Sequence, residues 1–185
     1  GRLCEVGMLA LEAMAGELPP GLPAIGASPD GLMTWPDGSV EVVEVKCRSP
    51  FRSVGGGQMQ ILHHAASQSL QAHHVPQLQL HMLCAGPACT SALVVLLTAT
   101  RGASLLRLPR DDAYIDDMLR WAALFNTRHV QAGLPPPMNW WRGEEGHEEL
   151  LRATRRVAES AQVVAVVEER ELQRSPLRGA FFCDG

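Results

Sequence analysis

The chain has 185 residues, of which 46% are hydrophobic and only 5% aromatic, and its formal net charge is −4. The length fits one domain with an appendage, and the composition is sufficient for a mainly aliphatic core. The negative charge argues against broad nonspecific binding to nucleic acid, although a local set of cations could still line a groove. No segment is long and apolar enough to predict a membrane span.

The sequence opens without an initiator Met or a signal-peptide pattern, and we expect it to be a fragment of a longer protein. Its five cysteines form no Cys-x-x-Cys pair. An odd number of cysteines, mostly in apolar runs, indicates reduced and at least half-buried thiols in an intracellular protein, with no compartment assigned.

The first elements are predicted from the spacing of apolar side chains. Residues 3–15 read as a helix, with Gly16 as its C-cap. A connector rich in Pro and Gly follows over 16–23, and a short strand is expected over 24–27.

The stretch 28–46 predicts a β-hairpin that gathers charged side chains. A Pro-Asp-Gly turn joins its two strands, and the returning strand ends in a Glu-x-Lys triplet. Because side chains alternate along a strand, Glu44 and Lys46 share one face, and strand pairing brings Asp30 near it. Two carboxylates can hold a hard divalent cation, and a metal-bound water beside a Lys is suited to phosphodiester hydrolysis. The alternative is a turn Asp followed by a surface strand of alternating charge.

The amino-acid sequence of this hairpin resembles that of a known family. Asp30, thirteen further residues and then Glu44-Val45-Lys46 are similar to the PD-(D/E)xK nuclease signature. The longer text, Ala27-Ser28-Pro29-Asp30-Gly31-Leu32 and then Val43-Glu44-Val45-Lys46-Cys47, resembles the YqaJ-type viral recombinase family, to which lambda exonuclease belongs. The resemblance covers about residues 1–125. It implies an α/β fold with a restriction-endonuclease-like core, in which a mixed central β-sheet is flanked by α-helices.

The resemblance also implies the members of a metal-dependent active site. Asp30 and Glu44 would hold one or two Mg²⁺ or Mn²⁺ ions, helped by the Val45 carbonyl. Glu5 would assist from the family's Gly-x-x-x-Glu helix, and its alternative is a solvated residue in a first helical turn. Lys46 would position and stabilise the nucleophile.

The region after the hairpin is predicted as a loop over 48–57, a helix over 58–71 and a second helix over 75–85. Five of the seven histidines fall between His63 and His81. Their spacing matches no zinc motif, so we expect them to contact phosphate or solvent.

The second of these helices resembles the family's Gln-x-Gln helix. Gln77 and Gln79 lie about 200° apart around the helix, so both cannot do the same job. By the resemblance, Gln77 is the better match to the family's glutamine that orients the Lys. Gln79 is the second candidate or a DNA contact, and both could be ordinary polar helix positions. The predicted nucleic-acid-binding residues are Ser28, Arg48, Arg52 and Gln79.

The rest of the nuclease core, assigned to residues 1–130, is predicted as two strands and a helix. A continuous apolar run over 91–98 indicates a buried strand, and a further strand follows over 104–108. The next helix begins at Asp111 or Asp112 as N-cap.

Three segments follow this core. A Pro-rich linker is expected over 131–146 and a charged helical extension over 147–174, with the helical pattern starting at Glu144. Residues 175–185 are expected to be a poorly ordered tail.

Taken together, the residues and the resemblance predict a divalent-metal-dependent DNA nuclease, an exonuclease acting at duplex ends in recombination or replication. The implied partners are double-stranded DNA, further copies of the chain in a homo-oligomer and a recombination protein, with no membrane. The helix that binds the 5′-phosphate in the family would precede residue 1. The alternatives are a nuclease-like domain that binds nucleic acid or protein without cleavage, and a restriction-type endonuclease on the same core.

Overall fold

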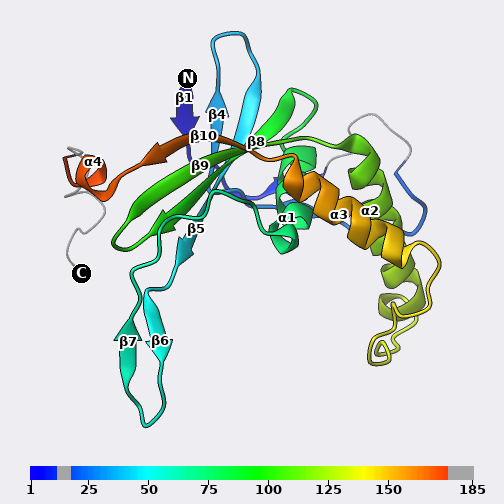
Figure 1. Cartoon of the computed structure of the whole chain (residues 1–185). Helices are drawn as coiled ribbons and strands as arrows, with labels where there is room; N and C mark the ends of the chain where they lie inside the picture. Colours follow the sequence, from blue (N-terminus) through cyan, green and yellow to red (C-terminus); the bar gives the residue numbers. More distant parts are fainter. Residues whose placement is uncertain (12–17, 175–185) are drawn as a thin grey trace.

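The computed structural model describes residues 1–11 and 18–174, and a six-stranded mixed sheet forms its centre (Figure 1). The strands lie in the order β1-β4-β5-β8-β9-β10. Their bounds are β1 (Arg2–Cys4), β4 (Gly31–Thr34), β5 (Val40–Arg48), β8 (Cys89–Thr98), β9 (Gly102–Pro109) and β10 (Gln162–Val167). The β5–β8 pair is parallel, and the other described neighbours in this sheet are antiparallel. The predicted α/β class with a mixed central sheet is therefore confirmed.

Two small two-stranded sheets accompany the central one. Strand β2 (Leu9–Ala10) pairs with β3 (Gly26–Ala27). Strand β6 (Phe51–Ser53) pairs with β7 (Met59–Ile61) in a hairpin that projects away from the body (Figure 1).

The helices alternate with the later strands of the central sheet along the chain. They are α1 (Val75–Cys84), preceded by a 3-10 turn (Ala72–His74), α2 (Asp112–Phe125), continued by a π-helical turn (Asn126–Val130), α3 (His147–Glu159) and α4 (Glu169–Arg174). Asp111 is the N-cap of α2 and accepts a hydrogen bond from the Tyr114 backbone, as predicted for one of the two aspartates. None of the helices within the described ranges is long and apolar enough to cross a membrane.

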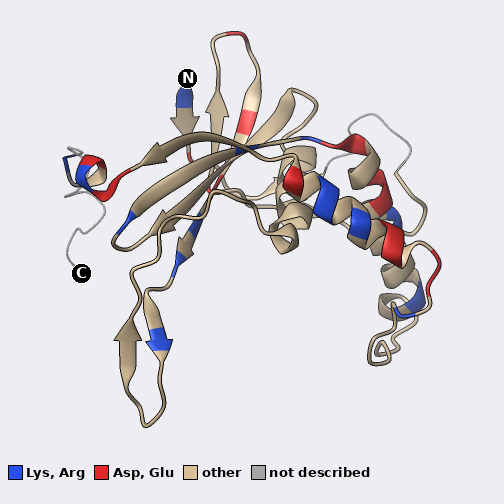
Figure 2. Ribbon diagram, in the orientation of Figure 1, with Lys and Arg blue, Asp and Glu red and all other residues tan. Residues whose placement is uncertain are grey.

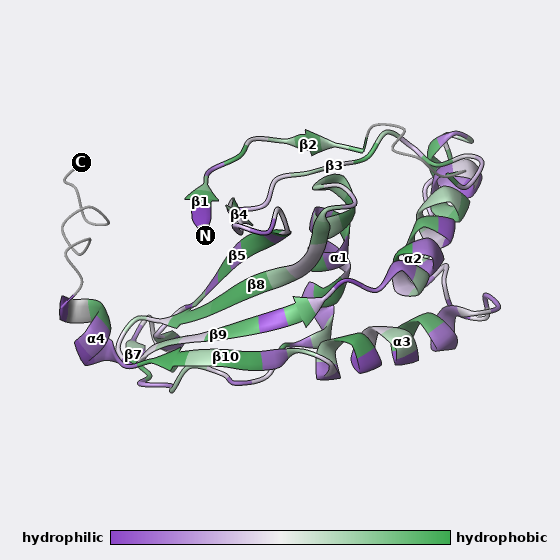
Figure 3. Cartoon of the chain, turned by 90° about the horizontal axis from the view of Figure 1, so that it is seen from above, coloured by the Kyte–Doolittle hydropathy of each residue, from purple (hydrophilic) through white to green (hydrophobic). Residues whose placement is uncertain are grey.

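The core forms where α1 and α3 pack against one face of the sheet. The strand register places Val42 beside Ala92 and Ala92 beside Leu108, and all three side chains are fully buried. Leu78 of α1 and Val157 of α3 belong to the same buried cluster. The strand predicted over 91–98 forms within β8, with Ser91, Ala92 and Val94 buried and the other side chains half-buried, and Figure 3 shows apolar positions along it.

The first predicted helix is wrong over the residues that the structure describes. Residues 2–4 form β1, which pairs antiparallel with β4, and Leu9–Ala10 form β2. The unpaired edge of β4 offers hydrogen bonds that outweigh the local apolar spacing. The rest of that prediction, including the Gly16 cap, falls on 12–17 and lies outside the described residues.

The loop over 48–57 and the helix over 58–71 are also wrong, because the β6–β7 hairpin occupies part of both. Its turn uses Gly55, Gly56 and Gly57, with φ values of +93°, +58° and +77°. A glycine run can adopt such left-handed angles at low cost, which allows the chain to reverse. Residues 62–71 contain no helix.

The single helix predicted from Glu144 to Arg174 is wrong as well. The segment forms α3, β10 and α4, and β10 extends the central sheet beside β9. Its valine-rich sequence suits a strand, and β9 provides the open edge. Gly102, with φ +85°, marks the close approach, since a Cβ there would collide with the Val167 carbonyl. The preceding segment over 131–146 is formed of turns and irregular chain.

The face of β5 opposite α1 carries a second charged cluster. Glu41 is only 3% exposed. It accepts hydrogen bonds from Trp35 Nε1 (2.7 Å), Ser91 Oγ (2.5 Å) and Arg107 Nε (2.6 Å). Glu41 and Arg107 therefore satisfy each other's charge within the fold.

Candidate active site

Asp30 reaches the strand that carries Glu44 and Lys46. It directly precedes β4, which pairs with β5 in register Gly31 to Val43. Its Oδ2 accepts a hydrogen bond of 2.7 Å from the Val45 backbone N–H. The predicted hairpin therefore forms, and it brings Asp30 beside the Glu-x-Lys triplet.

Glu44, Lys46 and Gln77 form a closed triangle of hydrogen bonds. Lys46 Nζ donates to Glu44 Oε1 at 2.6 Å and to Gln77 Oε1 at 2.7 Å. Gln77 Nε2 donates to the same Glu44 oxygen at 2.9 Å. Glu44 and Lys46 share one face of β5, and the first turn of α1 presents Gln77 to them. The predicted contact between Gln77 and Lys46 is thus present, and Lys46 Nζ is held from two sides.

His81 lies behind this triangle, where the sequence reasoning did not place it. It is 4% exposed, and its Nδ1 lies 3.3 Å from Glu44 Oε2, so the expected contact with solvent or phosphate is wrong for this histidine. Burial lowers the pKa of His81 and Lys46 lowers it further, although Glu44 acts in the opposite direction. The i, i+4 spacing from Gln77 is the signal that could have placed both side chains on one side of α1.

The remaining oxygen of Glu44 provides a test of whether a cation fits. Glu44 Oε2 is buried and makes no hydrogen bond among the described residues, although His81 Nδ1 lies within ion-pair distance of it at 3.3 Å. An unpaired buried carboxylate oxygen is costly, and a hard cation would compensate it. A divalent ion held by Asp30 and Glu44, with water and substrate oxygens completing its shell as Mg²⁺ commonly has, stays a prediction.

A larger set of protein ligands is not found. Within residues 1–11 and 18–174, no three His, Cys, Asp or Glu side chains converge closely enough to hold a metal ion. Glu5 is exposed after β1, and in the described part of the chain no hydrogen bond or ion pair joins it to Asp30 or Glu44. A ligand role for Glu5 or for the Val45 carbonyl stays a prediction.

The candidates for nucleic-acid binding are dispersed. Ser28 is exposed just before Asp30, Arg48 ends β5, and Arg52 lies on the projecting hairpin. Figure 2 shows basic positions at this end of β5 and on the hairpin, whereas α2 and α3 carry acidic and basic positions together. Arg48 and Lys46 line the same groove, which gives the negatively charged chain a local basic site.

Most of the described cysteines are at least half-buried, and Gln79 is fully buried. The four cysteines in the described residues are free thiols, and Cys47 is exposed, which differs from the expected burial. Gln79 has no exposed surface: its Nε2 donates to the Pro109 carbonyl and its Oε1 accepts from the Asp111 N–H. A DNA contact does not fit such a side chain. It instead joins α1 to the junction between β9 and α2.

Replacing Gln79 with Ala is expected to lower the free energy of unfolding by about 2 kcal/mol. The change removes two partly buried hydrogen bonds, one to the Pro109 carbonyl and one from the Asp111 N–H, and each such bond contributes about 0.5–1.5 kcal/mol. Urea unfolding followed by circular dichroism measures the loss. An unfolding midpoint equal to that of the wild type would contradict the structural role.

Comparison of the chain with protein-family models, with curated proteins and with solved structures finds no match in any of the three. The function is therefore inferred from the geometry of the site and from the amino-acid sequence of the hairpin.

Proposed function

We propose that the protein is a divalent-metal-dependent DNA nuclease of the PD-(D/E)xK type, with a restriction-endonuclease-like core. The observation that carries the proposal is the triangle of Glu44, Lys46 and Gln77 beside Asp30. Side chains that lie far apart in the sequence converge there with two carboxylates and one ammonium, and Glu44 has an oxygen left unpaired.

The residues divide the chemistry between them. Asp30 and Glu44 would hold Mg²⁺ or Mn²⁺, which supplies an activated water and neutralises charge on the phosphate. Lys46 stabilises negative charge on the attacking oxygen and on the phosphate during the transition state. Gln77 restricts the position of Lys46 Nζ, and neutral His81 supports the Glu44 carboxylate from the buried side.

We propose further that the enzyme is an exonuclease acting at duplex ends in recombination or replication. The support is the sequence Ser28-Pro29-Asp30-Gly31-Leu32. Its resemblance to the YqaJ-type family is more specific than that of an isolated Asp followed by a Glu-x-Lys triplet. A homo-oligomer and a recombination partner protein belong to this proposal on the same ground.

Digestion of linear duplex DNA beside a closed circle tests both levels of the proposal. In Mg²⁺ the wild type should degrade the linear DNA alone, and chelator or Lys46→Ala should stop degradation. Cutting of the circle would replace the exonuclease with a restriction-type endonuclease. If the folded wild type binds DNA but cleaves neither substrate in Mg²⁺ or Mn²⁺, the protein is instead a nuclease-like domain that binds DNA without cleaving it.

Replacing Gln77 with Ala is expected to reduce the cleavage rate by about 10- to 100-fold, the usual effect of losing a partner that orients a site residue. Gln77 is exposed, so the unfolding midpoint should not move. Gln79→Ala is the matched comparison, because it should lower stability while the folded fraction keeps its cleavage rate. Equal activity of Gln77→Ala and wild type would remove Gln77 from the site.

A further inference from the structure

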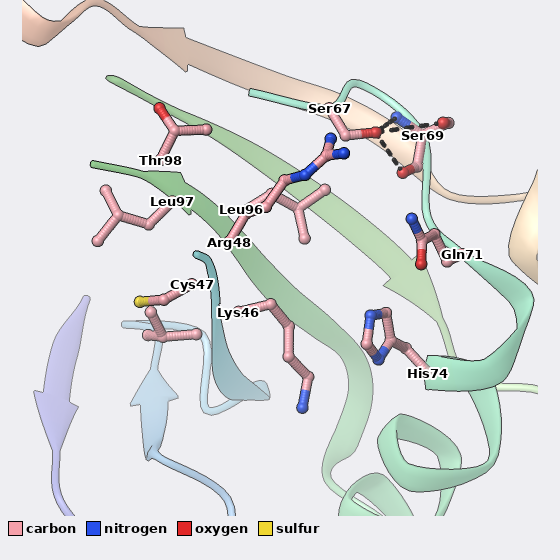
Figure 4. Close-up of a pocket in the computed structure, with 11 residues that line it drawn as sticks. Lys46, Cys47, Arg48, Ser67, Ser69, Gln71, His74, Leu96, Leu97 and Thr98 are labelled. Carbon is pink, nitrogen blue, oxygen red and sulfur yellow. Dashed lines mark hydrogen bonds between the residues drawn. The ribbon is translucent and has the colours of Figure 1, made fainter. Parts of the chain in front are cut away.

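A groove of about 380 Å³ continues from Lys46 toward the end of β5 (Figure 4). Three separate segments line it: the end of β5, residues 67–74, and the end of β8. Its polar lining is formed by Arg48, Ser67, Ser69, Gln71, His74 and Thr98. The volume lies in the range of about 300–1,000 Å³ typical of small-molecule sites, and suits a single nucleotide.

The charges of the groove point to an anionic ligand. Lys46 and Arg48 contribute two cations, and none of the lining residues is Asp or Glu. Lys46 is occupied by Glu44 and Gln77, whereas the guanidinium of Arg48 has no ion pair or hydrogen bond within the described residues. An exposed guanidinium of this kind can form two parallel hydrogen bonds to one phosphate.

Hydroxyl groups face the same cation. In Figure 4 the Arg48 side chain extends toward Ser67, whose hydroxyl lies 3.4 Å from that of Ser69. Ser67 Oγ donates to the Ser69 carbonyl (3.0 Å), so the long hydroxyl contact takes its proton from Ser69, and a phosphate oxygen could replace Ser67 as the acceptor of that proton. A guanidinium with serine hydroxyls opposite is a donor set that matches phosphate oxygens.

The spacing along β5 links the groove to the active site. Lys46 and Arg48 are two residues apart on one face of the strand, which separates their Cα atoms by about 6.6 Å. Successive phosphates of a nucleic-acid strand are separated by a comparable distance. A strand whose scissile phosphate lies at Lys46 would therefore bring the neighbouring phosphate to Arg48. The apolar floor at Leu96 could pack against the sugar or base between them.

We infer that this groove binds the nucleotide next to the scissile linkage, with Arg48, Ser67 and Ser69 holding its internal phosphodiester. The inference rests on the proposed nuclease function and extends it, because it assigns the path of the substrate strand across β5. It places Arg48 in substrate binding and leaves Asp30, Glu44 and Lys46 to the chemistry.

A charge-neutralisation cycle tests the assignment. Short duplexes carry one uncharged methylphosphonate at the linkage on either side of the cut. For the wild type, neutralising one of these linkages should lower kcat/KM about tenfold, the effect of one charge-assisted hydrogen-bonded contact. Arg48→Ala should show the same loss on ordinary DNA and no further loss on the neutralised duplex. Arg155→Ala, which removes an exposed cation on α3 outside the groove, should behave as the wild type.

If Arg48→Ala and the methylphosphonate each lower kcat/KM and the two reductions multiply when they are combined, the two groups act independently. That result would overturn the proposed contact. Coupling of Arg48 only to a terminal 5′-phosphate, tested with phosphorylated and hydroxyl ends, would also overturn it and assign the groove to end recognition. If the wild type cleaves nothing, the nuclease proposal fails by itself. The same cycle is then measured on the dissociation constant in Ca²⁺, where coupling to an internal linkage supports the groove and its absence overturns it.

Discussion

Replacing Asp30 with Asn, or Glu44 with Gln, is expected to reduce DNA cleavage by at least about a thousandfold, because in the proposed mechanism each removes a carboxylate that binds the cation. Each replacement is nearly isosteric, so the fold should persist. Glu44 has a second role, since its Oε1 also accepts the hydrogen bonds from Lys46 and Gln77. Cleavage of linear duplex DNA and calorimetric titration with Mn²⁺ measure the two effects.

Asp37→Asn is the matched control for these variants. Asp37 lies in the turn of the same hairpin, where its Oδ1 accepts hydrogen bonds from the N–H (2.9 Å) and hydroxyl (2.6 Å) of Ser39. Its replacement should leave cleavage and metal binding unchanged. Wild-type Mn²⁺ affinity in both Asp30→Asn and Glu44→Gln would show that the cation binds elsewhere.

Replacing Glu41 with Ala is expected to lower the free energy of unfolding by about 3 kcal/mol while the folded protein keeps its activity. The change leaves Arg107 without its counter-charge and strips partners from Ser91 and Trp35. Breaking a buried ion pair costs about 3–5 kcal/mol, and the lower figure applies because Arg107 is partly exposed. Denaturant unfolding at pH 7 measures the loss, and an effect below about 1 kcal/mol would contradict it.

The same carboxylate should make stability depend on pH. Burial alone would raise the pKa of Glu41, but the hydrogen bonds from Arg107, Ser91 and Trp35 and the charge of Arg107 outweigh burial and hold it below its ordinary value of 4.5. The stabilisation is therefore complete above about pH 4.5 and is lost as the pH falls through the lower, folded-state pKa. Glu41→Gln should lack this part of the acid destabilisation in unfolding curves at pH 7 and below 4.5.

Elements that depend on local chemistry could be predicted from the sequence. The Pro-Asp-Gly turn, the apolar run of β8 and the Asp111 cap each specify their structure within a few residues. Alternation along β5 was sufficient to place Glu44 and Lys46 together. The angular separation of Gln77 and Gln79 on α1 was sufficient to show that both could not reach the site, and the resemblance favoured Gln77. Neither showed that Gln79 joins α1 to the next helix.

Elements that depend on distant partners could not be predicted in this way. The segment over 2–4 becomes a strand because β4 offers an edge, and the segment over 162–167 because β9 does. The groove could not be predicted for the same reason, because its lining comes from three parts of the chain. The position of His81 could not be predicted either, because it depends on how closely α1 approaches β5.

The position of β10 also affects how the chain can be divided. The Pro-rich segment over 131–146 looks like a place to cut, yet a protein ending there would lack both α3 and β10. Its β9 would then offer unpaired backbone groups along an open margin, and the core positions that face Val157 would meet water. Such a fragment is prone to edge-to-edge aggregation. During synthesis the sheet likewise stays incomplete until the last of its strands has left the ribosome, so the folding of the whole unit waits for residue 167.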